Sequence, residues 1–288
     1  MLNKQKNINK PIFFSETCFP KIDENRMKSV GDVKHARDSF LTKRPSNLLF
    51  LLEKRYSWMN SFIAHDSKGI EVGCGAGFAK EFIQHEDFLL TDISDHAWVD
   101  SYVDALHMPY ADSSLDFIVS SNMIHHLANP AIFFNECSRV LKKDGFLIIQ
   151  EINASLLMRV ILKLMRHEGY SYDVNVFDPE VVCNDPCDAW SANCALPNLL
   201  FDNKQNFEET FSFKIVHQRY TEFLIFLLSG GVIAKTKTIN LPRYVLKVVD
   251  KLDDICIAFG KKIFPLQRQL VLKNTKITSS ANVEYGKF

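Results

Sequence analysis

The sequence predicts an α/β protein built on a mostly parallel sheet with helices on both faces. Two observations lead to this prediction. Short apolar runs alternate with helical patterns between residues 67 and 152, which is typical of consecutive βαβ units. In addition, 47% of the 288 residues are hydrophobic and 24% are charged, so the chain can bury the core that such a sheet requires.

Charge and cysteine usage narrow the class of protein. Lys plus Arg and Asp plus Glu are equal at 34 each, so the chain lacks the basic excess of proteins that grip a nucleic-acid backbone. Seven cysteines form no regular framework, and the N-terminal residues contain no apolar signal-peptide core. The longest apolar run, residues 223–234, is short and interrupted by glycines. We therefore expect a cytoplasmic protein that binds no nucleic acid.

The elements of the first half are expected in the following order. A polar leader over residues 1–30 precedes a helical segment over residues 31–66, in which Pro45 opens a second helical piece. Residues 142–145 (KKDG) are expected to close the helix that Asn129 and Pro130 open. Strands are predicted over residues 69–73, 87–94, 98–105, 115–122 and 145–152, and helices over residues 78–86 and 129–142.

The second half is less regular. We predict a basic amphipathic helix over residues 154–170, an irregular segment over residues 171–206, and a strand that runs into an apolar segment over residues 213–226. A helix over residues 242–264, a final strand over residues 268–274 and a polar tail from Thr275 follow. A basic amphipathic helix packs on a sheet or lies on a membrane surface, so peripheral membrane contact stays open.

A glycine-rich loop follows the first predicted strand. Gly73, Gly75 and Gly77 permit positive φ angles and let a ligand approach the bare backbone at the start of the next helix. The dinucleotide fingerprint needs a small residue where this chain has Phe78, which disfavours an NAD-dependent oxidoreductase. The buried-strand residue Glu71 favours a cationic ligand without a diphosphate.

Two acids stand at the ends of the next two strands. Asp92, which lies 15 positions after Gly77, is placed to accept hydrogen bonds from both hydroxyls of a ribose. Asp104 follows the next short run and is placed to meet an adenine amino group. The loop and both acids are expected at the carboxyl ends of neighbouring strands, where open α/β sheets bind ligands.

Four segments between residues 68 and 151 carry a resemblance to a known family. EVGCGAG, TDIS, VDALHMPYADSSLDFIVSSNMIHHLANP and RVLKKDGFLIIQE resemble, in order and spacing, the motifs of class I S-adenosylmethionine-dependent methyltransferases of the type 11 kind. The resemblance implies a Rossmann-like sheet of seven strands whose last strand is antiparallel, with S-adenosyl-L-methionine as the cofactor. It implies a cofactor site formed by Glu71, Gly73, Cys74, Gly75 and Gly77 at the methionine end, Asp92 and Ile93 at the ribose, Asp104 and Ala105 at the adenine, and Ser121 and Asn122 beside the sulfonium.

The resemblance also implies how the chain is organised. The expected parts are a flexible leader (1–30), an N-terminal helical cap (31–66), the cofactor-binding core (67–152), and the rest of the sheet with acceptor-site insertions (153–288). The flanking regions more loosely resemble those of methyltransferases of bacterial surface-polysaccharide pathways. We expect methyl transfer to an oxygen or nitrogen of such a carbohydrate. A lipid or quinone-like acceptor, a small metabolite, and a non-catalytic binding protein remain open, as does the oligomeric state.

Candidate catalytic residues follow the fourth and fifth strands. His125 and His126 suit a general base whose pKa is near neutrality, and Glu151 could orient or deprotonate an acceptor. The alternative is that these side chains only pack and form hydrogen bonds in their loops. Three cysteines share one irregular segment, but no second pair of ligands follows, so we expect no metal site there: Cys183, Cys187 and Cys194.

Overall fold

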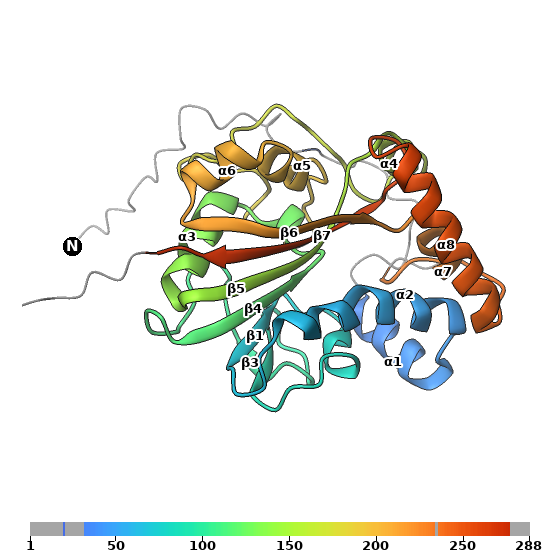
Figure 1. Cartoon of the computed structure of the whole chain (residues 1–288), viewed down its shortest axis with the longest axis horizontal. Helices are drawn as coiled ribbons and strands as arrows, with labels where there is room; N and C mark the ends of the chain where they lie inside the picture. Colours follow the sequence, from blue (N-terminus) through green and yellow to red (C-terminus); the bar gives the residue numbers. More distant parts are fainter. Residues whose placement is uncertain (1–19, 21–31, 234–235, 277–288) are drawn as a thin grey trace, which may run out of the picture.

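The computed structural model describes residue 20, residues 32–233 and residues 236–276, and it contains a seven-stranded sheet with helices on both faces (Figure 1). The strand order is β3-β2-β1-β4-β5-β7-β6. Neighbouring strands from β3 to β5 are parallel, whereas β7 is antiparallel to both β5 and β6. The predicted mostly parallel sheet with an antiparallel last strand is thereby confirmed. The predicted leader, apart from residue 20, and most of the predicted tail lie outside the described residues.

The strands and helices have the following bounds. The strands are β1 (Gly69–Val72), β2 (Phe88–Asp92), β3 (Ser101–Tyr102), β4 (Leu115–Ser121), β5 (Leu141–Ile152), β6 (Phe213–Thr221) and β7 (Gln267–Asn274). The α-helices are α1 (Val33–Lys43), α2 (Ser46–Tyr56), α3 (Pro130–Val140), α4 (Leu156–Met165), α5 (Leu196–Phe201), α6 (Lys204–Thr210), α7 (Leu224–Ser229) and α8 (Arg243–Phe259). Three 3₁₀ helices are η1 (Ser57–Phe62), η2 (Phe78–Glu81) and η3 (Ile124–His126).

The alternation of side chains along the central strands creates two cores, one on each face of the sheet. On β4, Ile118 joins a cluster that includes residues of α3, α5 and α6. Its neighbours Phe117 and Val119 point to the other face and join residues of α1, α2, α7 and α8. Because every central strand is covered on both faces, each reads as a nearly continuous apolar run.

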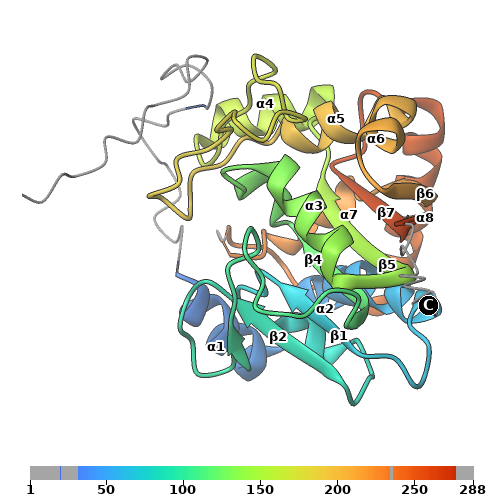
Figure 2. The same cartoon turned by 90° about the vertical axis from the view of Figure 1, so that its left-hand side faces the viewer.

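The N-terminal helices lie beside the C-terminal ones although they are far apart in the sequence (Figure 1, Figure 2). Arg55 of α2 forms a buried ion pair with Glu222, with Nε–Oε1 and Nη2–Oε2 distances of 2.9 and 2.8 Å. The side chain of Asn47 donates to the carbonyls of Leu228 and Ile239. These contacts fix α2 against the segment that surrounds α7.

Two predicted boundaries around the core are wrong. The helix expected over residues 78–86 is only the single turn η2, because Asn60 donates to the carbonyl of Phe82 and accepts from the amide of Gln84. Residues 142–145 do not close α3, which ends at Val140; they belong to β5. The side-chain amide of Asn274 donates to the carbonyls of Ser138 and Leu141 at the end of α3, so these groups are satisfied without a further helical turn.

Three further elements differ from expectation in extent. The third strand is reduced to Ser101–Tyr102, and the helix expected over residues 154–170 ends at Met165, where Arg166 adopts a left-handed conformation. The segment over residues 171–206 is not wholly irregular, since it contains α5 and the start of α6. Pro197 lies in the first turn of α5, and Asn203 caps α6, which are local signals that favour both helices.

Candidate functional site

The register of the parallel strands brings the predicted cofactor residues to one edge of the sheet. Val72 of β1 is level with Thr91 of β2 and with Ser120 of β4. The residue after each of these, Gly73, Asp92 or Ser121, therefore emerges at the same level. Asp92 is in turn level with Tyr102, two residues before Asp104. The predicted methionine, ribose, adenine and sulfonium positions thus form one row along the carboxyl edge.

The loop over residues 73–77 combines tight packing with one open position. Gly73, Gly75 and Gly77 have φ angles of 64°, 49° and 64°, a region that L side chains rarely adopt. A Cβ atom at Gly73 would lie 2.4 Å from the Met123 side chain, and one at Gly77 would lie 2.7 Å from Trp98. A Cβ atom at Gly75 would meet no heavy atom within 4 Å, so a ligand can lie against the backbone there.

Side chains from three elements hold this loop in place. Asp92 Oδ2 accepts a 2.8 Å hydrogen bond from the amide of Gly75, and Trp98 Nε1 donates at 2.8 Å to the Gly75 carbonyl. Arg37 of α1 donates at 2.6 Å to the carbonyl of Ala76 and lies over the Trp98 ring. Sequence reasoning missed Arg37 and Trp98 as loop supports, because neither belongs to a motif and Arg37 is 39 residues from its partner.

Glu71 is a buried carboxyl group with one unpaired oxygen. Burial raises its pKa well above the ordinary value, and the nearby Asp92 carboxylate adds to that rise. The hydroxyl of Tyr56 donates to Oε1 at 3.4 Å, whereas Oε2 has no hydrogen-bond partner. An unpaired buried acceptor beside an open glycine loop fits a ligand that carries an ammonium group, so the donor set suits S-adenosylmethionine.

The remaining predicted cofactor residues lie along the same edge, and several already have protein partners. Asp104 accepts from the amide of Leu106 at 2.9 Å and lies 3.2 Å from Nδ1 of His107. Asn122 has a φ angle of 52° and accepts from Gln267 Nε2 at 2.9 Å. Three others differ in exposure: Cys74 is buried, Ala105 packs against the core, and Ile93 is exposed.

Glu151 is enclosed beneath the loop that carries the two histidines. Its Oε1 lies 2.6 Å from Nδ1 of His125 and also accepts from the amide of Ile152 at 2.7 Å. Its Oε2 accepts from the amide of Ile124 at 2.8 Å. With both oxygens engaged and the residue fully buried, Glu151 orients η3 and His125 from below.

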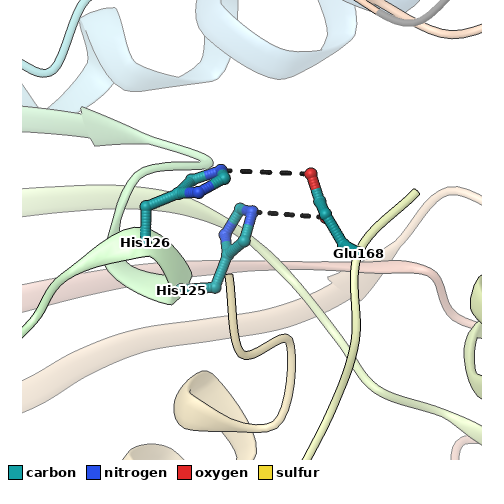
Figure 3. A group of neighbouring side chains, drawn as sticks. All are labelled: His125, His126 and Glu168. Atoms are coloured by element: carbon teal, nitrogen blue, oxygen red, sulfur yellow. Dashed lines mark ion pairs between the residues drawn. The ribbon is translucent and has the colours of Figure 1, made fainter. Parts of the chain in front are cut away.

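Sequence reasoning missed a second acidic side chain beside the histidines, Glu168, which faces both of them (Figure 3). Its Oε2 lies 3.7 Å from Nε2 of His125, and its Oε1 lies 4.0 Å from Nε2 of His126. The segment that carries Glu168 is held there by a β-bridge between Gly169 and Asn193, whose amide donates to the carbonyl of His125 at 2.9 Å. No local motif marks Glu168, because this placement depends on a long-range contact.

Burial and mutual charge shift the pKa values of this cluster in different directions. Burial and the neighbouring His125 lower the pKa of His126 to about 4. For His125, burial opposes the charged form, but the carboxylates of Glu151 and Glu168 outweigh it and raise the pKa. Burial likewise opposes the ionised form of Glu168, yet His167, His125 and His126 together lower its pKa. With a pKa of about 4, His126 is neutral near pH 7 and can accept a proton, but it is a weaker base than the histidine of near-neutral pKa that the sequence suggested.

The three cysteines considered as zinc ligands do not gather in this way. Cys183 and Cys194 are buried, whereas Cys187 is exposed. Cys194 instead donates its thiol hydrogen to Glu168 Oε2 at 3.2 Å. Within the part of the chain that the structure describes, the group of His, Cys, Asp or Glu side chains spaced to share an ion is His125, His126 and Glu168.

Comparison with known proteins supports the resemblance found in the sequence. Residues 70–149 match a family described as "Methyltransferase domain". A protein of Mycolicibacterium smegmatis, named as a probable S-adenosylmethionine-dependent methyltransferase, is 29% identical over 115 residues. This alignment covers 35% of the present chain and 45% of the relative, so the chain spans less than half the length of that relative.

Solved structures of low sequence identity are also similar. A SAM-dependent methyltransferase from Archaeoglobus fulgidus is 16% identical, with a TM-score of 0.47 over 78% of this chain and 93% of that one. A SAM-dependent methyltransferase from Methanosarcina mazei is 15% identical, with a TM-score of 0.41 over 76% of this chain and 97% of that one.

Among the described residues, no helix combines the length and the apolar character needed to cross a bilayer.

Proposed function

Because residues 70–149 match a methyltransferase domain and lie in a sheet with the expected antiparallel last strand, we propose that this chain is a class I S-adenosylmethionine-dependent methyltransferase. When bound, the cofactor supplies an activated methyl group for in-line transfer to a nucleophile. The residues of the chain bind the donor, orient the acceptor and exclude water, and positioning of this kind accounts for much of the rate of such a transfer.

One observation carries this proposal. Asp92 lies directly beneath the glycine loop, where Gly75 leaves open space above the backbone and Glu71 offers an unpaired oxygen. Asp92 offers a carboxylate to a ribose, Gly75 offers exposed backbone, and Glu71 offers a buried acceptor to an ammonium group. Together these groups match a nucleoside that carries an amino acid. A dinucleotide would need a small residue where Phe78 is buried against the ring of Phe40.

We propose a carbohydrate acceptor that enters over η3. His126 is then the candidate general base. The ring centroid of Trp190 lies 6.1 Å from that of His126 in an edge-to-face arrangement, which provides an aromatic surface next to the reacting groups. The methyl group forms a bond to an oxygen or nitrogen of the acceptor, the carbon–sulfur bond breaks, and the acceptor proton passes to His126 or to solvent. A lipid-linked or small-metabolite acceptor is the alternative.

Isothermal titration with S-adenosylmethionine and with NADH tests the donor. We expect one site for the methyl donor and no binding of NADH. Purified protein should then transfer a labelled methyl group to material from sugar-nucleotide and lipid-linked pools. Binding without transfer to any pool would favour a non-catalytic binding protein, and binding of NADH alone would refute the proposal.

We also propose that the chain associates peripherally with an anionic membrane surface. Five large apolar side chains form an outward stripe along α8, on the side opposite its buried residues: Tyr244, Val248, Leu252, Ile255 and Phe259. Phe259 is 89% exposed and Tyr244 is 71% exposed. Exposed Lys247 and Lys251 flank the stripe, as expected of a helix that lies in the plane of an anionic interface.

Co-sedimentation with vesicles tests this association. The chain should bind vesicles that contain phosphatidylglycerol more strongly than vesicles of phosphatidylcholine alone. Replacing two stripe residues, Val248→Asp with Phe259→Asp, should reduce binding at least about tenfold, because each change places a charge in the interface. Ser61→Asp adds the same charge at an exposed site outside the stripe and should bind normally. Concentration-dependent dimerisation without vesicle binding would assign the stripe to a second copy instead.

A further inference from the structure

We propose that His125, His126 and Glu168 form a binding site for one divalent first-row transition-metal ion. One potential ligand atom from each residue lies within 4.8 Å of those of the other two. In both imidazoles Nε2 is the nitrogen that faces an oxygen of Glu168. Figure 3 shows the two rings directed toward the same carboxylate. This site departs from the expectation of no metal, and it uses none of the residues assigned to the methyl donor.

The spacing of the three groups suits shared ligation better than direct hydrogen bonding. Two ligand atoms that each lie about 2.1 Å from one ion are separated by at most about 4.2 Å. Glu168 Oε2 lies 3.7 Å from His125 Nε2, and the other oxygen, Oε1, lies 4.0 Å from His126 Nε2. Both distances fall below this limit and exceed the length of a hydrogen bond, so the carboxylate faces each ring with one oxygen. Only a small closure of the side chains is needed to bring all three onto one ion.

In both histidines the hydrogen-bond partner of Nδ1 leaves Nε2 available to bind a metal. His125 Nδ1 lies 2.6 Å from the Glu151 carboxylate, and His126 Nδ1 lies 3.2 Å from the carbonyl of Ser191. A carboxylate and a carbonyl both accept hydrogen bonds, so each Nδ1 carries a hydrogen, and in the neutral form of each ring Nε2 has the lone pair that faces Glu168. Metal-binding histidines regularly have this arrangement, with a carboxylate or carbonyl behind the ring.

The donor set and its exposure indicate the class of ion. Two imidazoles and one carboxylate suit borderline divalent metals such as Zn²⁺, Mn²⁺ or Fe²⁺ rather than Ca²⁺, which prefers oxygen ligands. The side chains of His126 and Glu168 are 19% and 14% exposed, whereas that of His125 is 4% exposed. Three protein ligands with one partly open side leave coordination positions for water or for an oxygen of a substrate.

A role for the ion in methyl transfer rests on the proposed function, whereas the site itself does not. Met123, two residues before His125, packs where a Cβ atom of Gly73 would lie, so η3 adjoins the predicted donor loop. An ion bound there can hold an acceptor hydroxyl and lower its pKa. That role would supply an oxygen nucleophile near neutral pH, with His126 acting as a ligand instead of a base.

The competing structural role is a buried ion-pair cluster without metal. His167 Nε2 lies 3.2 Å from Glu168 Oε1, and the Cys194 thiol donates to Oε2, so Glu168 has partners in the absence of an ion. These contacts use the same carboxylate oxygens that face His125 and His126. A protonated histidine would then neutralise Glu168, and added metal would have no effect.

Metal titration of the 288-residue chain separates these roles. After treatment with EDTA and dialysis, the protein is titrated with Zn²⁺ in a calorimeter and with Co²⁺ by visible absorption. We expect one equivalent of each to bind. Glu168→Gln and His126→Gln should each weaken binding at least about 100-fold, and Glu151→Gln about 10- to 100-fold through the orientation of His125. His65→Gln, which removes an exposed imidazole elsewhere, should bind like the wild type.

A measurement on the unaltered chain guards against variants that fail to fold. Added Mn²⁺ should broaden the ring-proton NMR signals of His125 and His126 and leave those of His65 sharp. Wild-type protein that binds none of these ions, or variants that bind with unchanged affinity, would overturn the site. S-adenosylmethionine binding is measured in parallel. Metal binding without donor binding would refute the proposed function alone, and donor binding without metal would refute this site alone.

Discussion

The amide of Gly75 donates a 2.8 Å hydrogen bond to Oδ2 of Asp92, which joins two residues that lie 17 positions apart. The other oxygen, Oδ1, accepts from the amide of Ser94 at 2.8 Å. Asp92 therefore faces the loop with a fixed orientation, and each carboxylate oxygen keeps a second lone pair for a ribose hydroxyl. The carboxylate supports the loop and keeps acceptor capacity for the predicted ribose.

Asp92→Ala should weaken binding of S-adenosylmethionine about 100-fold, because a hydrogen bond to a charged group contributes about 1.5–3 kcal/mol. Isothermal titration measures the change. Asp95→Ala removes an exposed acid three residues after Asp92 and should bind normally. Equal affinity of the Asp92 variant and the wild type would show that the ribose is held elsewhere.

Glu71→Gln should change stability in a manner that depends on pH. Burial raises the folded-state pKa of Glu71 above its ordinary 4.5, so the folded protein holds this proton over a range in which the unfolded chain has lost it. The free energy of unfolding of the wild type therefore falls as pH rises above 4.5. Gln does not titrate, so the stability of the variant relative to the wild type should increase with pH.

Urea unfolding at about pH 5 and about pH 8 measures that difference. Glu86→Gln, at an exposed position, provides the matched control and should show a much smaller change with pH. The same Glu71 variant should bind S-adenosylmethionine more weakly, since a Gln amide, unlike the carboxyl group, cannot ionise to offset the ammonium charge of the ligand. A stability difference that is constant between the two pH values would contradict a raised pKa of the buried Glu71 carboxyl group.

The core of the fold could be predicted from the sequence because its signals are local. β1, β2, β4 and the second part of β5 are short apolar runs, and Asn129 with Pro130 marks the start of α3. The predicted helix over residues 78–86 failed for a non-local reason. Asn60 binds the backbone groups of Phe82 and Gln84, and no pattern in residues 78–86 reveals that contact.

The residues of the candidate site likewise fall into those that the sequence predicted and those that depend on non-local contacts. The glycines and Asp92 could be placed because strand order and register convert sequence position into spatial position. Glu168 could not be placed, since it follows α4 in a segment without regular structure and reaches His125 only through the bridge of Gly169 with Asn193. Residues that loops carry over a sheet edge escape prediction because periodicity does not describe their paths.

His126→Gln should lower the turnover of methyl transfer about 100-fold while leaving the dissociation constant of S-adenosylmethionine unchanged, the usual size of a lost acid–base contribution. The residue lies beyond the donor row and contacts Ser191 and Glu168. Single-turnover transfer of a labelled methyl group checks the rate, and His65→Gln supplies the control. A variant with full turnover would limit His126 to a structural role.

Arg55→Ala should destabilise the chain by about 3–5 kcal/mol, because it leaves the carboxylate of Glu222 buried without its partner. Gln150 Nε2, at 3.2 Å from Glu222 Oε1, provides one hydrogen bond but no charge. Urea unfolding measures the loss. Arg243→Ala breaks the exposed pair with Glu53 and should cost about 0–1 kcal/mol.

The pair Arg55→Met with Glu222→Leu tests the origin of this loss. Replacing both charges by apolar side chains removes the unpaired buried carboxylate, so the double variant should recover most of the stability that Arg55→Ala loses. Both residues are almost fully buried, with side chains 5% and 1% exposed. In Arg55→Ala, water therefore cannot solvate the carboxylate of Glu222 and restore the lost stability. A double variant as unstable as Arg55→Ala would mean that α2 is held mainly by packing and by the Asn47 contacts rather than by this ion pair.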